Sequence, residues 1–349
     1  MIIGLVLGAL ALALSIILTP VIRDAFLRLG FVDEPDNDRK LHARSVPRVG
    51  GIAVFVAYLG SLGIVALVGT LLGKVEIPHI EGGWWLLGGT SFVFAVGLLD
   101  DLVGLRPKQK LLGQVLAASV VWYGGVQIHV FEGIAFHGWL SALLTVSWLV
   151  FCTNAFNLID GMDGLAAGAA LFSTLTIMAA GIMGHNWALV FVTIPLAGCL
   201  FGFLRYNFNP ASVFLGDCGS LTLGFFLGCA GALWSQKINT FFGLAAPVMA
   251  LSLPLIDTSL AIARRVLRNR PLFAGDRGHI HHRLLDRGNS PRQAAYVLYG
   301  VSALAALFSL LQQAWAGRLS GLIALLFCGL VWLGIQYLGY LEFVYIRWF

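Results

Sequence analysis

The sequence is poor in charge. Asp, Glu, Lys and Arg make up only 11% of its 349 residues, whereas soluble domains carry roughly 25%. Hydrophobic residues make up 58%, and the mean hydropathy is +0.86. A water-soluble fold of this size has too little interior for so much apolar surface. The composition therefore excludes a soluble globular protein and predicts one whose solvent is the lipid bilayer.

Other signals are missing too. The five cysteines are scattered, without the spacing of a metal site or a disulfide framework, so we interpret them as small buried apolar residues. No GxxxxGK[ST] motif occurs, which excludes an ordinary P-loop nucleotidase. The chain has no internal repeat, no low-complexity linker and no separate soluble segment. We therefore expect a single integral-membrane domain over residues 1–349.

What the sequence does contain is a series of apolar runs long enough to cross a bilayer, at about 20 residues each. They predict an all-α, polytopic bundle of about eleven transmembrane helices. The predicted segments are 2–22, 50–72, 84–99, 111–126, 139–153, 165–183, 187–204, 219–234, 241–263, 294–313 and 319–344.

The basic residues indicate the topology. Nineteen of the 22 Lys and Arg residues fall in alternate connections, and only Lys74, Lys237 and Arg318 fall in the others. The positive-inside rule places the rich set in the cytoplasm and the N-terminus outside. It also accounts for the net charge of +5, so we expect no nucleic-acid partner. The rich connections are 23–49, 100–110, 154–164, 205–218, 264–293 and the tail after 344.

Several aspartates lie against the apolar ends of these runs, where a carboxylate is expensive and commonly functional. Asp100 and Asp101 end one run, and two like charges at a helix C-terminus oppose both the helix dipole and each other. A hard divalent cation, Mg²⁺ or alternatively Mn²⁺, is the expected compensation. Asn157, Asp160 and Asp163 recur at intervals of three, which brings them toward one side of a helical turn. They lack the spacing and the closing Glu of an EF-hand.

The same loops carry cations suited to phosphate. Arginine forks match phosphate oxygens, and the loop 264–293 holds eight arginines and three clustered histidines. His279, His281 and His282, beside Arg277, could bind phosphate or a sugar or ligate a metal; zinc is disfavoured without a nearby cysteine. The other candidate phosphate-binding residues are Lys40, Arg44, Arg106 and Lys108.

Acids for a metal and cations for phosphates on one face are what phosphoryl transfer requires. An ion-coupled transporter is the alternative from another class, because intramembrane acids also mark transporters. Transporters hold such acids near the bilayer midplane, often in repeated halves, and this sequence does neither.

The sequence resembles the polyprenyl-phosphate N-acetylhexosamine-1-phosphate transferases over nearly its whole length, and most closely their bacterial undecaprenyl-phosphate GlcNAc-1-phosphate branch. The resemblance is carried by KLHARSVPRVGG, GLLDDL, NAFNLIDGMDGLAAG, FLGDCGS and RPLFAGDRGHIHHRLLDRG. It implies a Mg²⁺-dependent enzyme of the bacterial cytoplasmic membrane, with its active site facing the cytoplasm. The implied reaction transfers GlcNAc-1-phosphate from UDP-GlcNAc to undecaprenyl phosphate and releases UMP, the first lipid-linked step of a cell-surface polysaccharide such as lipopolysaccharide or a cell-wall polymer. A UDP-MurNAc-pentapeptide or another UDP-HexNAc is the alternative donor, and a homodimer is compatible with the sequence.

The resemblance also implies roles for particular residues. Asp100 and Asp101 match the family's acid pair, and Asp217, together with Asp101, matches its metal-binding position. Asn157, Asp160 and Asp163 match the nucleotide site, where we assign the two acids to the catalytic group with Asp100 and Asp101. The loop of Arg277, His279, His281 and His282 matches the segment that holds the pyrophosphate and selects the sugar. One departure concerns the Lys that variants of the family place three residues after the acid pair: here that position is Gly104, and Lys108 or Arg106 is expected to replace it.

Overall fold

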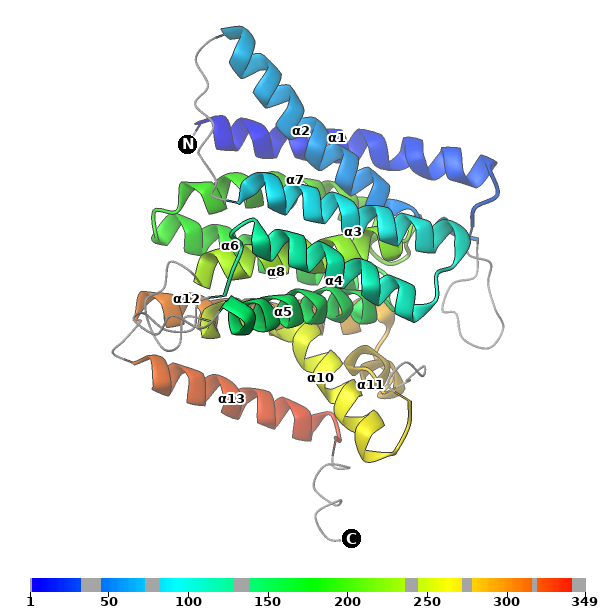
Figure 1. Cartoon of the computed structure of the whole chain (residues 1–349). Helices are drawn as coiled ribbons and strands as arrows, with labels where there is room; N and C mark the ends of the chain where they lie inside the picture. Colours follow the sequence, from blue (N-terminus) through cyan, green and yellow to red (C-terminus); the bar gives the residue numbers. More distant parts are fainter. Residues whose placement is uncertain are drawn as a thin grey trace.

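In the computed structural model the protein is a bundle of helices (Figure 1). The structure describes residues 2–32, 45–72, 82–128, 138–235, 244–271, 278–315 and 319–340, and within these ranges it contains helices and no strand. The elements are α1 (Ile2–Arg28), α2 (Gly50–Leu72), α3 (Gly83–Val103), α4 (Pro107–Tyr123), α5 (Gly138–Ile159), α6 (Leu165–Met183), α7 (Trp187–Asn207), α8 (Gly216–Ser235), α9 (Ala245–Ala250), α10 (Ser252–Leu267), α11 (Ile280–Asp286), α12 (Pro291–Ala314) and α13 (Ser320–Tyr337).

The predicted all-helical, polytopic class is confirmed. Nine helices in the described ranges are long and apolar enough to cross a membrane: α1, α2, α3, α5, α6, α7, α8, α12 and α13. The two remaining predicted runs correspond to α4, which has 17 residues, and to the pair α9 and α10. The count of eleven spans and the orientation of the termini stay predictions.

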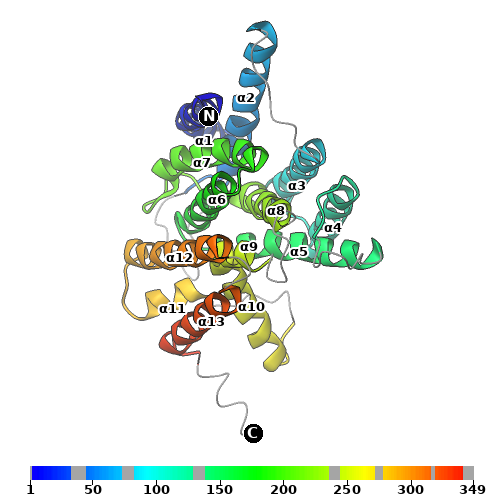
Figure 2. The ribbon, with the colours of Figure 1, turned by 90° about the vertical axis from the view of Figure 1, so that its left-hand side faces the viewer.

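The run predicted at 241–263 is broken into two helices, and a proline accounts for the break. A proline inside a helix removes one backbone donor, and its ring clashes with the carbonyl four residues earlier. For Pro254 that carbonyl belongs to Ala250, the last residue of α9. The freed Ala250 oxygen instead accepts a hydrogen bond from Ser173 Oγ at 2.8 Å. The break turns α10 out of the bundle, which Figures 1 and 2 show.

Helix α8 forms the centre of the bundle (Figure 2). Among its 20 residues only Asp217 and Leu233 are not buried. It packs against α3 on one side and α5 on another, and it also contacts α2 and α6, while α1 packs on α7 farther from the centre. Glycine allows the closest approach: a Cβ at position 224 would lie 2.5 Å from the Cys152 carbonyl oxygen of α5. Asp217 is therefore held at the tip of the most enclosed helix.

The loops that the sequence placed together do meet at one end of the bundle. In Figure 1 the ends of α1 and α3, the start of α4 and the short helix α11 lie on its right-hand side. Hydrogen bonds join distant segments there: the Phe214 amide donates to the Pro47 carbonyl, and the Gly50 and Gly51 amides donate to Phe214 and Leu215. The segment entering α2 is thus tied to the segment entering α8.

Candidate functional site

The acid pair lies where α3 turns back into α4. Gly104, with φ of +75°, ends α3, and Pro107 occupies the first turn of α4, so the two helices form a hairpin. One Asp100 oxygen accepts the Leu105 amide at 2.6 Å. The hairpin brings Lys110 back to the acid: its Nζ lies 2.7 Å from Asp100 Oδ2 and 2.8 Å from Asp217 Oδ2. A single ammonium therefore bridges carboxylates from α3 and α8.

Asp101 has a different function from its neighbour: it caps α8. Its Oδ1 accepts the Asp217 amide at 2.9 Å, and its Oδ2 accepts the Cys218 amide at 2.8 Å. These are free donors of the first turn of α8, and a carboxylate there also complements the helix dipole. Gly216, with φ of +76°, allows the approach, since a Cβ there would lie 2.8 Å from Asp101 Oδ2. Asp101 thus fixes the position of Asp217.

The turn between α5 and α6 brings Asp160 to the same place. Burial, together with the charges of Asp217 and Asp101, raises the pKa of the Asp160 carboxyl well above its usual value, and the nearby Arg48 opposes this rise. The Asp160 side chain makes no hydrogen bond within the described ranges. It is therefore an acidic group that faces other acids and is available to bind a ligand.

The other two polar residues of this turn serve the scaffold. Asp163 Oδ2 accepts Asn209 Nδ2 at 2.9 Å and the Ala211 amide at 3.0 Å, which ties the turn to the loop before α8. Asn157 Nδ2 donates to Ser220 Oγ of α8 at 3.0 Å. The three residues spaced three apart in the sequence therefore have different roles. Asp160 lies at the acid cluster, whereas Asn157 and Asp163 connect this turn to α8 and to the loop before it.

The histidine loop reaches the same turn from the other side. Asp257 of α10 accepts the Ile280 amide at 2.8 Å and lies 2.8 Å from His279 Nδ1. His281 then packs over Gly161, where a Cβ would lie only 2.9 Å from His281 Nε2. Neither ring nitrogen of His281 has a hydrogen-bond partner in the described part of the chain. Burial lowers the pKa of His281 to about 3, so the ring is neutral at physiological pH and suited to hydrogen bonding.

Not every predicted cation reaches the acids. The side chains of Arg106 and Lys108 are exposed, and the position expected for one of them belongs to Lys110. His282 lies on α11 with its ring 4.3 Å from that of His281. The predicted phosphate-binding residues Lys40, Arg44 and Arg277 lie outside the described residues. The sequence did contain a signal for Lys110. Gly104 and Pro107 predict a short turn between two helices, and residues 100 and 110 lie about one helical turn from it on either side, where they can face each other.

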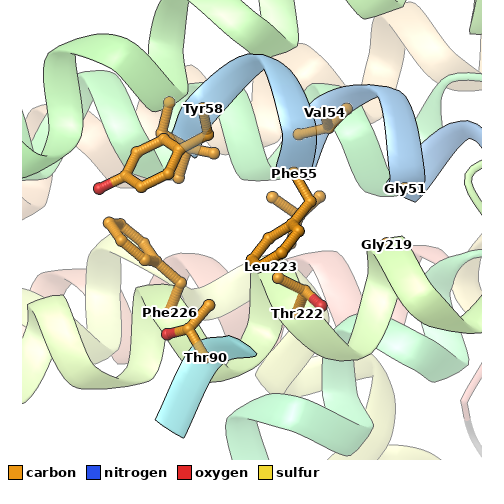
Figure 3. Close-up of a pocket in the computed structure, with 10 residues that line it drawn as sticks. Gly51, Val54, Phe55, Tyr58, Thr90, Gly219, Thr222, Leu223 and Phe226 are labelled. Carbon is orange, nitrogen blue, oxygen red and sulfur yellow. The ribbon is translucent and has the colours of Figure 1, made fainter. Parts of the chain in front are cut away.

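A pocket opens farther along α8, between α2 and α3 (Figure 3). Its residues are apolar except for a few hydroxyls, and Phe55 and Phe226 point into the space between the ribbons. The pocket begins at Gly51 and Gly219, and Gly219 is two residues from Asp217. The lining is Gly51, Val54, Phe55, Tyr58, Thr90, Leu196, Gly219, Thr222, Leu223 and Phe226. Such a lining suits a hydrocarbon chain.

The residues present fit a hard divalent cation in chemistry, and their side chains are arranged around Lys110. Asp217, Asp100 and Asp160 offer the carboxylate oxygens that Mg²⁺ prefers. Across the described part of the chain, however, no three His, Cys, Asp or Glu side chains form a ready-made metal site. The Lys110 ammonium instead stands between two of the acids. Both oxygens of Asp101 already accept backbone amides, so its predicted role as a ligand has less geometric support than that of Asp217.

Comparisons with known proteins identify the class. The family model for glycosyl transferase family 4 matches residues 84–235, which include the acid pair, Lys110, Asp160 and Asp217. The chain belongs to this family, as a relative of its polyprenyl-phosphate N-acetylglucosamine-1-phosphate transferases. It is therefore a multi-pass membrane protein related to phosphotransferases.

Three relatives show the range of the similarity. A probable undecaprenyl-phosphate N-acetylglucosaminyl 1-phosphate transferase of Bacillus subtilis (strain 168) is 35% identical over 81% of this chain and 78% of the relative. A decaprenyl-phosphate N-acetylglucosaminephosphotransferase of Mycolicibacterium smegmatis is 33% identical over 84% of this chain and 78% of the relative. A phospho-N-acetylmuramoyl-pentapeptide-transferase of Desulforudis audaxviator is 34% identical over 67% of this chain and 77% of the relative.

Proposed function

We propose that this protein transfers GlcNAc-1-phosphate from UDP-GlcNAc to undecaprenyl phosphate, giving undecaprenyl-diphosphate-GlcNAc and UMP. The observation that carries the proposal is the meeting of Asp100, Lys110, Asp160 and Asp217 at one end of the bundle, with His281 of α11 packed over the α5–α6 turn. This arrangement combines anionic oxygens for a cation with groups for phosphate and sugar. The names of the relatives supply the substrate class.

In the proposed reaction an oxygen of the lipid phosphate attacks the β-phosphorus of UDP-GlcNAc. The bond from the β-phosphorus to the oxygen bridging the two phosphates breaks, and UMP leaves with that oxygen. The lipid phosphate is already largely ionised near neutral pH, so no base is needed to activate it. Asp100 orients Lys110, whose ammonium neutralises phosphate oxygens, and Asp101 keeps Asp217 in place through the α8 cap.

The proposed cofactor is Mg²⁺, with Mn²⁺ as an alternative. Asp217 and Asp160 would hold it, and its charge would neutralise the pyrophosphate oxygens. Because Lys110 lies between Asp100 and Asp217, the cation and the ammonium share one acidic site. We propose that Lys110 stays paired with Asp100 and contacts the lipid phosphate, while the cation would compensate the charge of Asp217.

The donor is the finer part of the proposal. The segment RPLFAGDRGHIHHRL has the form RPxFxxDxxHxHHxL, which resembles the GlcNAc-1-phosphate branch. The similarity to a muramoyl-pentapeptide transferase keeps UDP-MurNAc-pentapeptide as the second candidate. His281 would contact the donor, since it is neutral, buried and has no partner in the described chain.

For the acceptor, the apolar pocket between α2 and α3 is a candidate for the isoprenoid chain (Figure 3). It starts within two residues of Asp217, so a lipid phosphate at the acid cluster could extend its first isoprene units into it. We further propose that this end of the bundle faces the cytoplasm of a bacterial cell, where nucleotide sugars are made. The density of Lys and Arg in its loops supports that orientation.

The deciding experiment uses detergent-purified protein with undecaprenyl phosphate and a panel of UDP-sugars, with and without Mg²⁺. We expect UMP release with UDP-GlcNAc and Mg²⁺, and exchange of labelled UMP into UDP-GlcNAc. Asp217→Asn should abolish turnover while the protein still unfolds at the wild-type temperature. Full activity in Asp217→Asn would contradict the metal assignment. A protein that catalyses neither release nor exchange with any donor would overturn the proposed function.

A further inference from the structure

The turn that follows the last helix packs on the histidine loop. Tyr340, just beyond α13, is 1% exposed, and its hydroxyl donates to the Gly278 carbonyl at 2.9 Å. Gly278 directly precedes His279 and is 62 residues away in sequence. Figures 1 and 2 show the end of α13 next to α10 and α11. A residue outside every motif singled out in the sequence thus contacts the loop proposed to hold the donor.

Two arginines clamp the Tyr340 ring. The Arg283 guanidinium of α11 lies 3.7 Å from the ring centroid, and that of Arg264, at the end of α10, lies 5.3 Å away. Arg283 also donates to the Leu338 and Gly339 carbonyls, at 3.2 and 2.9 Å. A guanidinium over an aromatic face is attracted by the ring's electrons, and burial strengthens that attraction. The ring therefore joins three elements: α10, α11 and the C-terminal turn.

Asp257 also holds the backbone around His279, in addition to Tyr340. Asp257 holds His279 Nδ1 and the Ile280 amide from α10, while Tyr340 holds the Gly278 carbonyl from the C-terminal turn. The Arg264 guanidinium also packs directly on this backbone, since a Cβ at Gly278 would lie 2.7 Å from its central carbon. The backbone around His279 is thus fixed at both neighbouring residues.

We propose that Tyr340, with the turn at Leu338 and Gly339, is a positioning element for the histidine loop. The C-terminal turn sets where His279 and His281 stand relative to the α5–α6 turn, and so tunes binding of the nucleotide-sugar donor. Tyr340 itself touches no substrate. This inference rests on the proposed function, because it takes the histidine loop to be a donor-binding segment.

The test compares graded changes at Tyr340 with matched changes at Tyr337. Tyr340→Phe removes the hydroxyl, and with it the hydrogen bond to Gly278 and the hydroxyl's contact with Arg264. Tyr340→Leu also removes the ring that the two guanidinium groups contact. Tyr337 is a fair control: it lies three residues away, is 72% exposed, and contacts Arg287 at 4.7 Å. We expect the KM for the donor to rise roughly three- to tenfold in Tyr340→Phe and roughly 10- to 100-fold in Tyr340→Leu. The KM for polyprenyl phosphate should be unchanged, and Tyr337→Phe and Tyr337→Leu should match wild type.

A donor KM that stays at the wild-type value in Tyr340→Phe and Tyr340→Leu would overturn the proposal. An equal rise in the KM for both substrates would also overturn it, since that is the result of a general loss of structure. If Tyr340→Leu does not fold, the KM values of Tyr340→Phe decide.

A second measurement separates this inference from the proposed function. Hydrogen–deuterium exchange of the amides around 278–283 needs no turnover. We expect faster exchange there in Tyr340→Leu than in Tyr337→Leu, whatever the enzyme's substrate proves to be. Equal exchange in the two variants would refute the positioning role even if the transferase activity is found.

Discussion

Lys110 offers the sharpest test of the acid cluster, because one ammonium contacts two carboxylates that come from different helices. The change is Lys110→Gln, which keeps a long polar side chain and removes the charge. Without the ammonium, Asp100 and Asp217 repel each other, and an approaching phosphate meets two uncompensated acids. The expected result is a large loss of transfer activity in a protein that still folds.

The magnitude follows from burial. Truncating one partner of a buried, hydrogen-bonded charge pair between a protein and its ligand costs about 2–5 kcal/mol of binding, here the binding of a phosphate by the Lys110 ammonium. The side chains of Lys110, Asp100 and Asp217 retain 22%, 13% and 26% exposure, so water screens part of the interaction. We therefore expect about 2–3 kcal/mol, equivalent to a loss in kcat/KM of roughly 30- to 160-fold. Lys110→Arg keeps the charge but replaces a compact donor by a planar fork, and should lose less.

The assay is UMP release by purified protein, with thermal unfolding measured on the same samples. Lys108→Gln is the matched control, since it removes the same charge two residues away from an exposed side chain. Its kcat/KM should stay within about twofold of wild type, as surface changes away from such contacts have small effects. If Lys110→Gln keeps its kcat/KM within threefold of wild type, or if Lys108→Gln loses as much, the bridging role is refuted.

Three further predictions follow from individual contacts. Asp101→Asn should lower the stability of the protein by about 0.5–2 kcal/mol, through loss of the charged cap on α8; an unchanged unfolding temperature would refute that cap. Because burial lowers the pKa of His281 to about 3, the unfolded chain binds more protons below pH 6.5, so stability should fall as the pH drops. At pH 5 this amounts to about 2 kcal/mol, and His281→Gln should flatten the decline between pH 6.5 and pH 5 in thermal unfolding. Val54→Phe, which fills the apolar pocket, should raise the KM for polyprenyl phosphate and leave the KM for the donor unchanged. Val56→Phe, on the exposed face of α2, should change neither KM. Equal KM values for polyprenyl phosphate in the two variants would show that the lipid does not occupy the pocket.

The prediction from sequence worked best where one physical rule dominates. An apolar run of about 20 residues has few alternatives to a membrane helix, because backbone groups in hydrocarbon must be satisfied within the segment. The runs predicted at 50–72 and 165–183 coincide with α2 and α6, and the other predicted runs meet helices whose ends differ by up to seven residues. The run at 241–263 was the exception, since hydropathy does not register that Pro254 interrupts the helix at Ala250.

The site was predicted less completely. Sequence placed Asp100, Asp160, Asp217 and the histidines in one set of loops, and the structure does gather them at one end of the bundle. It assigned Asp101 to the metal site beside Asp217 and did not foresee that Asp101 caps α8. Adjacent side chains on a helix point about 100° apart, and only the position of α8 decides which one caps it. It selected Lys108 and Arg106 where the α3–α4 hairpin presents Lys110.

By itself, then, the sequence determined the solvent of this protein, its helical class and the chemical character of its loops, since these depend on composition and on residues close together in the chain. The tertiary structure alone decided which carboxylate shares the ammonium, which one caps α8, and that Tyr340 supports the histidine loop from 62 residues away. These are contacts between segments whose separation no local pattern records, and they form only when the helices that carry them pack against one another.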